Sequence, residues 1–363
     1  MNMKNGETEL ETRIERLLNL MEARSLDGFL VAETKNMLYF TGFSGGSMLL
    51  VLRDGESILF VYGVNYEAAK VETREASVEL VKQEESLIKK VTDRLKTRKI
   101  RNLGFDSLAA STYLKLKESS DGVAFKDASD LVWTLRRVKD PSEISLMKKA
   151  AELTSRGMEK AAEIIEAGIS EREVAAEIEY EMRKNGSDGV AFETIVSSGS
   201  NSAFPHGGCG DRVIKKGDLV VIDIGAKYRD YSSDLTRTFI IGKPSSKQFE
   251  IYETVRKAQE LAVKTARAKV EAKEVDRVAR DYISKAGYGE YFVHSLGHGV
   301  GLDVHEPPTL SPKSRDVLVE GNVVTIEPGI YIPGFGGVRI EDTVLILKEG
   351  VEKLTESPIQ IYF

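Results

Sequence analysis

Two aspartates stand where a carboxylate is costly unless something pairs with it. Asp223 follows the apolar and mostly β-branched run 219–222, which predicts a buried strand, and an unpaired carboxylate loses its hydration there. Asp234 comes directly before a second predicted strand, 235–241. A hairpin centred between residues 228 and 229 would place the two aspartates opposite each other, with Cβ atoms roughly 5 Å apart. Two carboxylates that close need a shared proton or a cation, and we expect a metal ion.

A second pair of acids repeats this arrangement near the C-terminus. Glu327 ends the apolar strand predicted at 323–327, and Glu341 ends another at 338–341. A turn centred on Gly334 places Glu327 opposite Glu341. A bulge would shift either register by one residue and turn an acid away from its partner. Because each hairpin is expected to present two facing acids, we expect the four acids to serve the same site.

All four histidines lie beyond residue 200, and one of them suits the same site. Glycines at 297, 299 and 301 surround His298, which lets the backbone come close to whatever the imidazole contacts. One imidazole with four carboxylates is a hard, oxygen-rich set of donors. It suits Mn²⁺, Co²⁺, Fe²⁺ or Zn²⁺ rather than a structural zinc ion, which prefers thiolates. Five ligands, some of them bridging, suit two ions, which would hold a hydroxide nucleophile at neutral pH.

Each of these residues taken singly also has a structural interpretation. A strand carboxylate can be satisfied by hydrogen bonds, and a histidine near a cleft, such as His206, His294 or His305, can simply be well packed. Cys209 lies near His206, but we interpret it as a loop cysteine without a role. The metal prediction rests on the five ligands together.

Pairs of helices are expected to position both hairpins. The segment Asp140-Pro141-Ser142-Glu143 predicts a helix start with a capping box, and Ser170 to Glu173 predicts another. After the first hairpin, helices are expected from about residue 246 to 268 and near 274–286, followed by the second hairpin. Each half thus has the order helix, helix, hairpin, which indicates an internal duplication of the pattern.

Two domains are expected from a length of 363 residues. Alternating helical and apolar strand patterns predict a small α/β domain over residues 1–130, which contains no histidine. Residues 131–139 are expected to be a linker, and 140–363 the catalytic domain.

Composition narrows the functional classes. The net charge of −6 argues against a general nucleic-acid surface. The single cysteine excludes an internal disulfide and fits a reducing compartment. We find neither a signal peptide nor a run of about 20 apolar residues. These observations predict a soluble cytoplasmic protein with no membrane partner.

The sequence motifs around these residues resemble those of the pita-bread metallopeptidases, which include methionine aminopeptidase, prolidase and aminopeptidase P. The matching motifs are Asp-Ile-Gly after the first strand, Gly-His-Gly-Val-Gly-Leu-Asp-Val-His-Glu-Pro, Glu-Pro-Gly-Ile-Tyr and Val-Arg-Ile-Glu-Asp-Thr. The N-terminal part resembles the creatinase-type domain of the branch that cleaves before proline. The resemblance implies an α/β N-terminal domain and an α+β pita-bread catalytic domain with a pseudo-twofold duplication.

The resemblance also implies roles for individual residues. Asp223 and Asp234 would bind one ion, His298 and Glu327 the other, and Asp234 and Glu341 would bridge. Glu327 would also be the general base that passes a proton to the proline nitrogen. The further positions that match the family are His206 and His305, which would contact substrate and stabilise the tetrahedral intermediate, and Tyr331 and Arg339, which would support the site and its catalysis. Tyr331 would also contact substrate. Mn²⁺ or Co²⁺ are the first expectation for the two divalent ions, and a homodimer is expected.

The predicted activity is hydrolysis of the bond before a penultimate proline in small peptides. That bond is a tertiary amide without an N–H, so peptidases that grip the N–H cannot use it, whereas a dinuclear site polarises the carbonyl directly. We expect an Xaa-Pro aminopeptidase; the alternative is an Xaa-Pro dipeptidase restricted to dipeptides. A metal-free amidinohydrolase or a non-catalytic binding module on the same fold would lack the five ligands.

Overall fold

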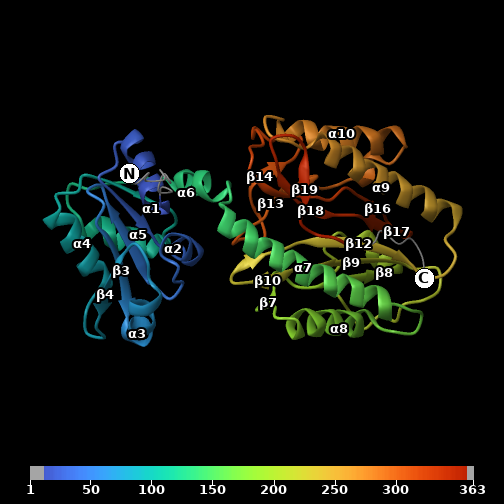
Figure 1. Cartoon of the computed structure of the whole chain (residues 1–363), viewed down its shortest axis with the longest axis horizontal. Coiled ribbons are helices and arrows are strands. Elements are labelled where there is room, and N and C mark those ends of the chain that lie inside the picture. The colour runs from blue at the N-terminus through green and yellow to red at the C-terminus, as the bar shows by residue number, and fades with distance from the viewer. Residues whose placement is uncertain (1–11, 358–363) are drawn as a thin grey trace, which may run out of the picture. The chain divides into compact units, whose positions relative to one another are not determined.

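The computed structural model describes residues 12–357 and divides the chain into two compact units at Arg136 and Arg137 (Figure 1). This division falls inside the segment 131–139 that was expected to be a linker. Most of that segment is helical, because it belongs to α6 (Ser129–Arg136), the last helix of the first unit. The expected domain ends, residues 1–11 and 358–363, lie outside the described residues.

The first unit is a six-stranded mixed sheet covered by helices. Its strand order is β4-β3-β2-β1-β5-β6; β1 to β3 are antiparallel neighbours, and the remaining pairs are parallel. The strands are β1 (Gly28–Val31), β2 (Met48–Leu52), β3 (Ser57–Tyr62), β4 (Ser77–Val81), β5 (Asn102–Phe105) and β6 (Ala124–Asp127). The other helices are α1 (Arg13–Ala23), α2 (Thr34–Thr41), α3 (Gly63–Glu72), α4 (Leu87–Thr97) and α5 (Ala110–Ser119).

The second unit has the expected order of helix, helix and hairpin, twice. The first half contains α7 (Pro141–Ile164), α8 (Glu171–Lys184), β7 (Gly189–Val190), β8 (Ile195–Ser198), η1 (Gly199–Ala203), β9 (Leu219–Ile224), β10 (Ala226–Tyr228), β11 (Tyr231–Ser232) and β12 (Leu235–Ile240). The second half contains α9 (Ser246–Thr265), α10 (Ala272–Lys285), η2 (Gly289–Tyr291), β13 (Gly297–Gly299), β14 (Glu306–Leu310), β15 (Val323–Ile326), β16 (Gly329–Ile332), β17 (Gly336–Arg339), β18 (Asp342–Ile346) and β19 (Val351–Lys353).

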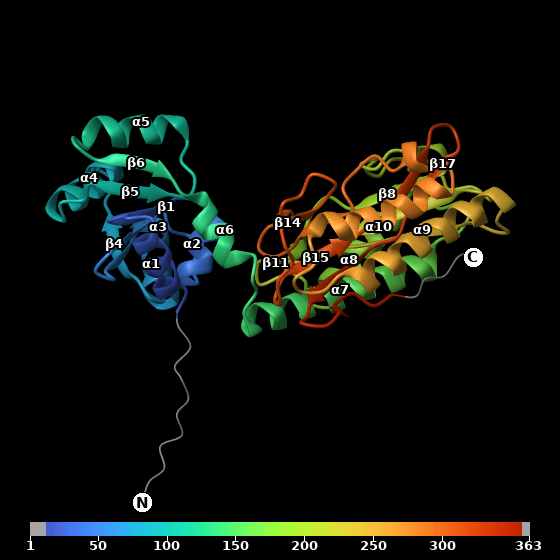
Figure 2. The ribbon, with the colours of Figure 1, turned by 90° about the horizontal axis from the view of Figure 1, so that it is seen from above.

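The two helix pairs enclose the strands of this unit. Figure 1 shows the strands between α9 and α10 above and α7 and α8 below, and Figure 2 shows α9 and α10 overlying the strands. Each helix pair shares a hydrophobic cluster with the strands of its own half. The predicted capping boxes form at Asp140 and Ser170, and Ser245 makes a third.

The register of the first hairpin differs from the prediction by two residues. Tyr228 pairs with Tyr231, so the turn consists of Arg229 and Asp230, and Asp223 faces Thr236 rather than Asp234. Arg229 and Asp230 both have positive φ, 46° and 68°, as a two-residue type I′ turn requires. No glycine marks that turn in the sequence. Because side chains alternate with a period of two, a two-residue shift keeps Asp234 on the face of Asp223.

The register of the second hairpin is confirmed. Ile326 pairs with Asp342, and Gly329 pairs with Arg339. Both pairings are symmetric about Gly334, which has a φ of 76°. Glu327 and Glu341 therefore occupy matching positions between the two paired stretches.

Threonine hydroxyls join the two halves where β12 runs beside residues 339–343. The Thr238 hydroxyl donates to the Arg339 carbonyl at 2.8 Å, and the Thr343 hydroxyl donates to the Asp234 carbonyl at 2.8 Å. The Glu341 N–H donates to the Thr236 carbonyl at 3.1 Å. This seam brings the acids of both hairpins together.

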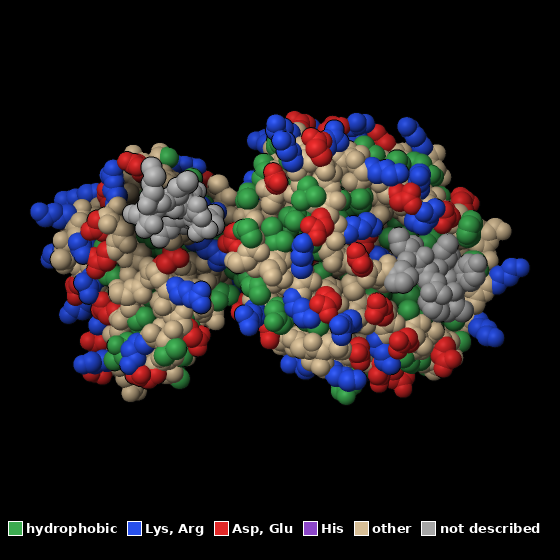
Figure 3. Space-filling model, in the orientation of Figure 1, with side chains coloured by type: hydrophobic (Ala, Val, Ile, Leu, Met, Phe, Trp, Pro, Cys, Tyr) green, Lys and Arg blue, Asp and Glu red, His purple; other side chains and the backbone are tan. Residues whose placement is uncertain are grey.

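The surface carries charges of both signs. On the face seen in Figure 3, basic and acidic side chains are interspersed over both units. Across residues 12–357, no helix combines the length and the apolar character that crossing a membrane requires.

Candidate metal centre

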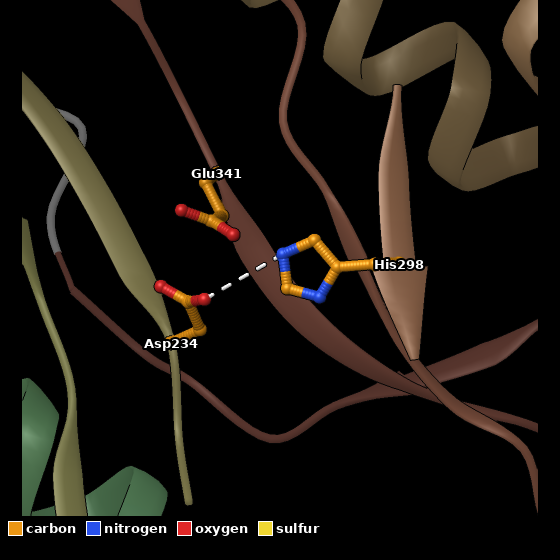
Figure 4. Close-up of side chains that lie close together, drawn as sticks. All are labelled: Asp234, His298 and Glu341. Carbon is orange, nitrogen blue, oxygen red and sulfur yellow. Dashed lines mark ion pairs between the residues drawn. The ribbon is translucent and has the colours of Figure 1, made fainter. Parts of the chain in front are cut away.

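Three of the predicted ligands converge at the seam between the halves. Asp234 directly precedes β12, His298 lies on β13, and Glu341 lies between β17 and β18 (Figure 4). One ligand atom from each lies within 4.8 Å of the other two. His298 Nε2 is 3.8 Å from Asp234 Oδ2. This spacing leaves room for an ion that all three side chains could reach.

The other two predicted ligands flank this group. Glu327 Oε1 is 3.3 Å from His298 Nε2. On the other side, Asp223 Oδ2 accepts a hydrogen bond of 2.6 Å from Arg339 Nη2. All five residues line one cavity of about 720 Å³. The structure thus brings the five predicted ligands into one place, and their role in binding metal stays a prediction.

Buried carboxylate oxygens indicate that a cation fits here. Asp223 Oδ1, Asp234 Oδ1 and Glu341 Oε1 are buried and have no hydrogen-bond partner among the described residues. Such atoms normally have a partner when buried. Burial, and after it the charges of neighbouring acids, raises the pKa of Asp234 and of Glu341 well above the usual carboxyl range. A divalent cation among these oxygens would remove both penalties, and oxygen with imidazole is a donor set that such ions accept.

The orientation of His298 leaves one ring nitrogen for the cavity. Its Nδ1 is 3.1 Å from the carbonyl of Gly299, which can only accept, so Nδ1 carries a proton. Its Nε2 faces the acids. Burial lowers the pKa of His298, but the hydrogen bond and charge of Glu327 outweigh it and raise the pKa. Conversely, burial raises the pKa of Glu327, and the contact with His298 outweighs it and lowers the pKa to about 2.

Arg339 connects three parts of the site. Besides Asp223, its guanidinium donates to the Tyr331 hydroxyl at 2.8 Å and to the Thr236 hydroxyl at 3.1 Å. Thr236 in turn donates to Glu341 Oε2 at 2.6 Å. Arg339 is buried, and its planar fork suits several fixed acceptors at once.

Tyr331 and His294 lie beside one another behind this arginine. The Tyr331 hydroxyl is 3.0 Å from His294 Nε2, and His294 Nδ1 is 2.8 Å from the Ser295 carbonyl. Nδ1 of His294 therefore carries the proton, and Tyr331 donates to Nε2. His294 lines the cavity, whereas Tyr331 is not among the lining residues. A direct contact of Tyr331 with substrate stays a prediction.

The remaining predicted residues lie on the open side. His206 and His305 line the cavity and are exposed. The His305 ring centroid is 4.2 Å from that of His298. Burial and the charge of His298 lower the pKa of His305. Both histidines are thus placed to contact a molecule that enters the cavity.

Sequence reasoning missed two kinds of residue. Thr236 contacts both Glu341 and Arg339, and its two-residue spacing from Asp234 was the available signal. Phe192, Ile195 and Val304 form apolar parts of the cavity wall, but no motif distinguishes them from core residues. Cys209 is not part of the group of ligands.

The chain belongs to metallopeptidase family M24, because residues 145–348 match the sequence profile of that family. Residues 13–138 match the Creatinase/Prolidase N-terminal domain. The predicted family, with its pita-bread fold and creatinase-type N-terminal domain, is confirmed. The protein is therefore a metal-dependent hydrolase that uses divalent ions.

Particular relatives cover almost the whole chain. The Xaa-Pro dipeptidase of Pyrococcus furiosus is 45% identical over 96% of this chain and 99% of its own length. The solved prolidase of Pyrococcus horikoshii OT3 is 42% identical, with a TM-score of 0.90 over 96% of this chain and 99% of that chain. The solved X-Pro aminopeptidase of Thermotoga maritima MSB8 is 39% identical, with a TM-score of 0.88 over 97% and 99%.

Proposed function

We propose that this protein is an Xaa-Pro dipeptidase that hydrolyses dipeptides with proline at the second position. Four carboxylates and one imidazole around one cavity carry the proposal, because that set of donors suits metal-assisted hydrolysis. Sequence analysis preferred an aminopeptidase that accepts longer peptides. The similarity to proteins named Xaa-Pro dipeptidase and prolidase favours the alternative.

The proposed cofactor is a pair of divalent metal ions. Mn²⁺ and Co²⁺ are the preferred candidates, and Zn²⁺ and Fe²⁺ are the alternatives. Asp223 and Asp234 would hold one ion, His298 and Glu327 the other, and Asp234 and Glu341 would bridge. When bound, such a pair polarises the scissile carbonyl and makes a nucleophile available at neutral pH. The unpartnered oxygens of Asp223, Asp234 and Glu341 support this assignment.

The surrounding side chains would prepare the ligands and the substrate. Arg339 fixes the carboxylate of Asp223 through its 2.6 Å hydrogen bond. The contact between Nδ1 of His298 and the Gly299 carbonyl directs Nε2 toward the acids.

Glu327 would accept the proton of the attacking water and deliver it to the proline nitrogen. His206 and His305, on the open side of the cavity, would contact substrate and stabilise the developing oxyanion. Tyr331 would act through its contacts with Arg339 and His294.

The proposed ability to cleave before proline follows from the substrate's chemistry. The bond before proline has no N–H, so a site that acts on the carbonyl alone can cleave it. The apolar side chains of Phe192, Ile195 and Val304 offer a surface for the non-polar parts of a dipeptide.

An aminopeptidase acting on longer peptides is the second candidate. The similarity to the Thermotoga maritima enzyme favours it. The two functions differ in whether the cavity admits a residue beyond proline. The predicted homodimer and cytoplasmic location stay predictions from the sequence.

Hydrolysis of Ala-Pro and Ala-Pro-Ala separates the candidates. The protein is stripped with a chelator and reloaded with Mn²⁺, Co²⁺ or Zn²⁺ one at a time, with Ala-Ala as the control for proline specificity. We expect metal-dependent cleavage of Ala-Pro only, and loss of that cleavage in Glu327→Ala at an equal protein concentration.

Comparable rates on Ala-Pro and Ala-Pro-Ala would establish the aminopeptidase instead. A metal-loaded protein that cleaves neither peptide would contradict both candidates.

A further inference from the structure

A buried ion pair lies beside the cavity and has no part in the proposed chemistry. Lys139 Nζ is 2.5 Å from Glu306 Oε1, and each side chain is 1% exposed. Glu306 begins β14 directly after His305 and lines the cavity, whereas Lys139 is not among the lining residues. The ammonium group therefore reaches the cavity wall from behind.

The backbone around Lys139 is fixed within the second unit. The Lys139 N–H donates to the Gly321 carbonyl at 2.9 Å. The Asn322 side chain donates to the Arg137 carbonyl at 2.8 Å, and Arg137 Nη2 is 2.8 Å from Asp316 Oδ1. Three contacts thus hold residues 137–139 against residues 316–322, and the ammonium group is presented from a rigid base.

On the other side, the Glu306 carboxylate packs against the connection between β13 and β14, residues 300–305. A Cβ atom at Gly301 would lie 2.6 Å from Glu306 Oε1, so the carboxylate occupies the space beside that backbone. The Gly301 carbonyl accepts a hydrogen bond of 2.8 Å from the Ser232 N–H, two residues before Asp234. The pair therefore supports the segment that carries His305.

Strand pairing alone does not fix the conformation of residues 300–305. Glu306 pairs with Gly299, but the register shifts between His298 and Gly299. Such an irregularity re-aims nearby side chains. A charge pair at this point supplies the missing constraint.

Stability alone is a weak reason for such a pair. Removing two charges from water is costly, and apolar residues of similar volume often do as well or better. A buried pair beside a functional loop can instead fix one conformation of that loop.

We propose that Lys139 is a positioning residue: through Glu306 it fixes residues 300–305 and so holds His305 at the cavity. The kinetic part of its test rests on the proposed Xaa-Pro hydrolysis, whereas the structural part does not.

The kinetic test is a double-mutant cycle on the metal-loaded full-length protein. Lys139→Met is expected to lower kcat/KM for Ala-Pro by about 10–100-fold, as losses of supporting contacts do, with metal content unchanged. In a His305→Ala background the same substitution should change kcat/KM by less than about twofold, because Lys139 acts through His305.

Two further variants complete the set. Glu306→Gln removes the charge but keeps an acceptor for Lys139, so it should have a smaller effect; it replaces Lys139→Met if that protein does not fold. Lys90→Met is the matched control, because Lys90 pairs with Glu79 in the first unit at 3.1 Å with side chains 22% and 23% exposed. It should leave kcat/KM unchanged.

Amide hydrogen exchange gives a readout that does not depend on activity. In Lys139→Met, exchange of residues 300–306 should accelerate by about tenfold, and in Glu306→Gln by a smaller factor, while β9 and β12 keep the wild-type rates. If the wild-type protein cleaves no Xaa-Pro peptide, the proposed function fails and exchange alone decides on the positioning role. The positioning role is overturned by unchanged exchange in this segment, or by an equal kinetic loss with and without His305.

Discussion

The two hairpins of the catalytic unit supply the same number of acids but differ in what accompanies them. Asp223 and Asp234 come from the first hairpin, and within the described chain their basic partners, Arg339 and His298, belong to the second half. The second half brings Glu327 and Glu341 together with the imidazole of His298 and the guanidinium of Arg339. Arg339 reaches across the seam to Asp223. The duplicated pattern is therefore asymmetric: both halves contribute acids, whereas the basic groups that contact those acids come from the second half.

Substitution of the acid beside the imidazole should have the largest effect. Glu327→Gln keeps the shape of the side chain but removes both the proposed base and a ligand, so kcat should fall by roughly 10²–10⁴-fold. The check is kcat for Ala-Pro with metal content measured on the same sample. Full metal content with near-normal kcat would show that Glu327 is not the base.

The cross-seam arginine should matter less than the acids it orients. Arg339→Lys keeps the charge but cannot reach Asp223, Tyr331 and Thr236 together, so activity or metal affinity should fall about 10–100-fold. Isothermal titration with Mn²⁺ and kcat/KM for Ala-Pro measure the two quantities. Lys257→Arg, at the surface of α9 where Lys257 pairs with Glu260 at 3.1 Å, is a control for a change of basic residue in the same half. Equal values for Arg339→Lys and wild type would contradict the organising role of the second half.

The acids of both halves should make metal stabilisation depend on pH. Burial raises the pKa of Asp234 and Glu341, so the folded metal-free protein holds protons that the unfolded chain releases near pH 4. As pH rises above that value, the free energy of unfolding of the metal-free protein falls through these groups. Metal replaces the protons, so the increase in Tm caused by Mn²⁺ should be larger at pH 8 than at pH 5.5. A Mn²⁺-induced increase in Tm that is smaller at pH 8 than at pH 5.5 would contradict a metal site shared by Asp234 and Glu341.

The smallest expected effect compares the second helix of each half. Ser170 caps α8 with its side chain, whereas Glu271 makes no such hydrogen bond to α10 within the described chain. Ser170→Ala should lower the free energy of unfolding by about 1 kcal/mol, and Glu271→Ala should change it by less than about 0.5 kcal/mol. Urea unfolding of the metal-loaded proteins measures both. Equal losses would mean that the two helix starts are equivalent after all.

The sequence predicted the second hairpin better than the first because of what each turn contains. Gly334 marks the second turn, and its positive φ fits the register that was expected. The first turn places Arg229 and Asp230 in left-handed conformations that cannot be predicted from their residue types. The predicted centre of the turn was therefore wrong by one residue, and the predicted strand pairing was wrong by two. The prediction of a site survived because a shift of two residues preserves the face of the sheet.

Other features lay beyond the reach of motifs. The contact of Thr236 with Glu341 depends on how β12 packs against the second half, and the pair of Lys139 and Glu306 joins residues far apart in the chain. Both are tertiary contacts that local patterns do not encode. Motifs around the ligands indicated the class of reaction, whereas the choice between dipeptides and longer peptides depends on the cavity wall.

The seam between the halves has a consequence for the protein during its own synthesis. Asp223 and Asp234 leave the ribosome well before Glu327 and Glu341, and Thr343 closes the seam later still. The proposed set of ligands is therefore incomplete until the last strands of the chain have folded against the first half. A nascent fragment that ends before Glu341 lacks one of the proposed ligands and therefore carries no complete centre. The order of synthesis thus delays activity until the fold is finished.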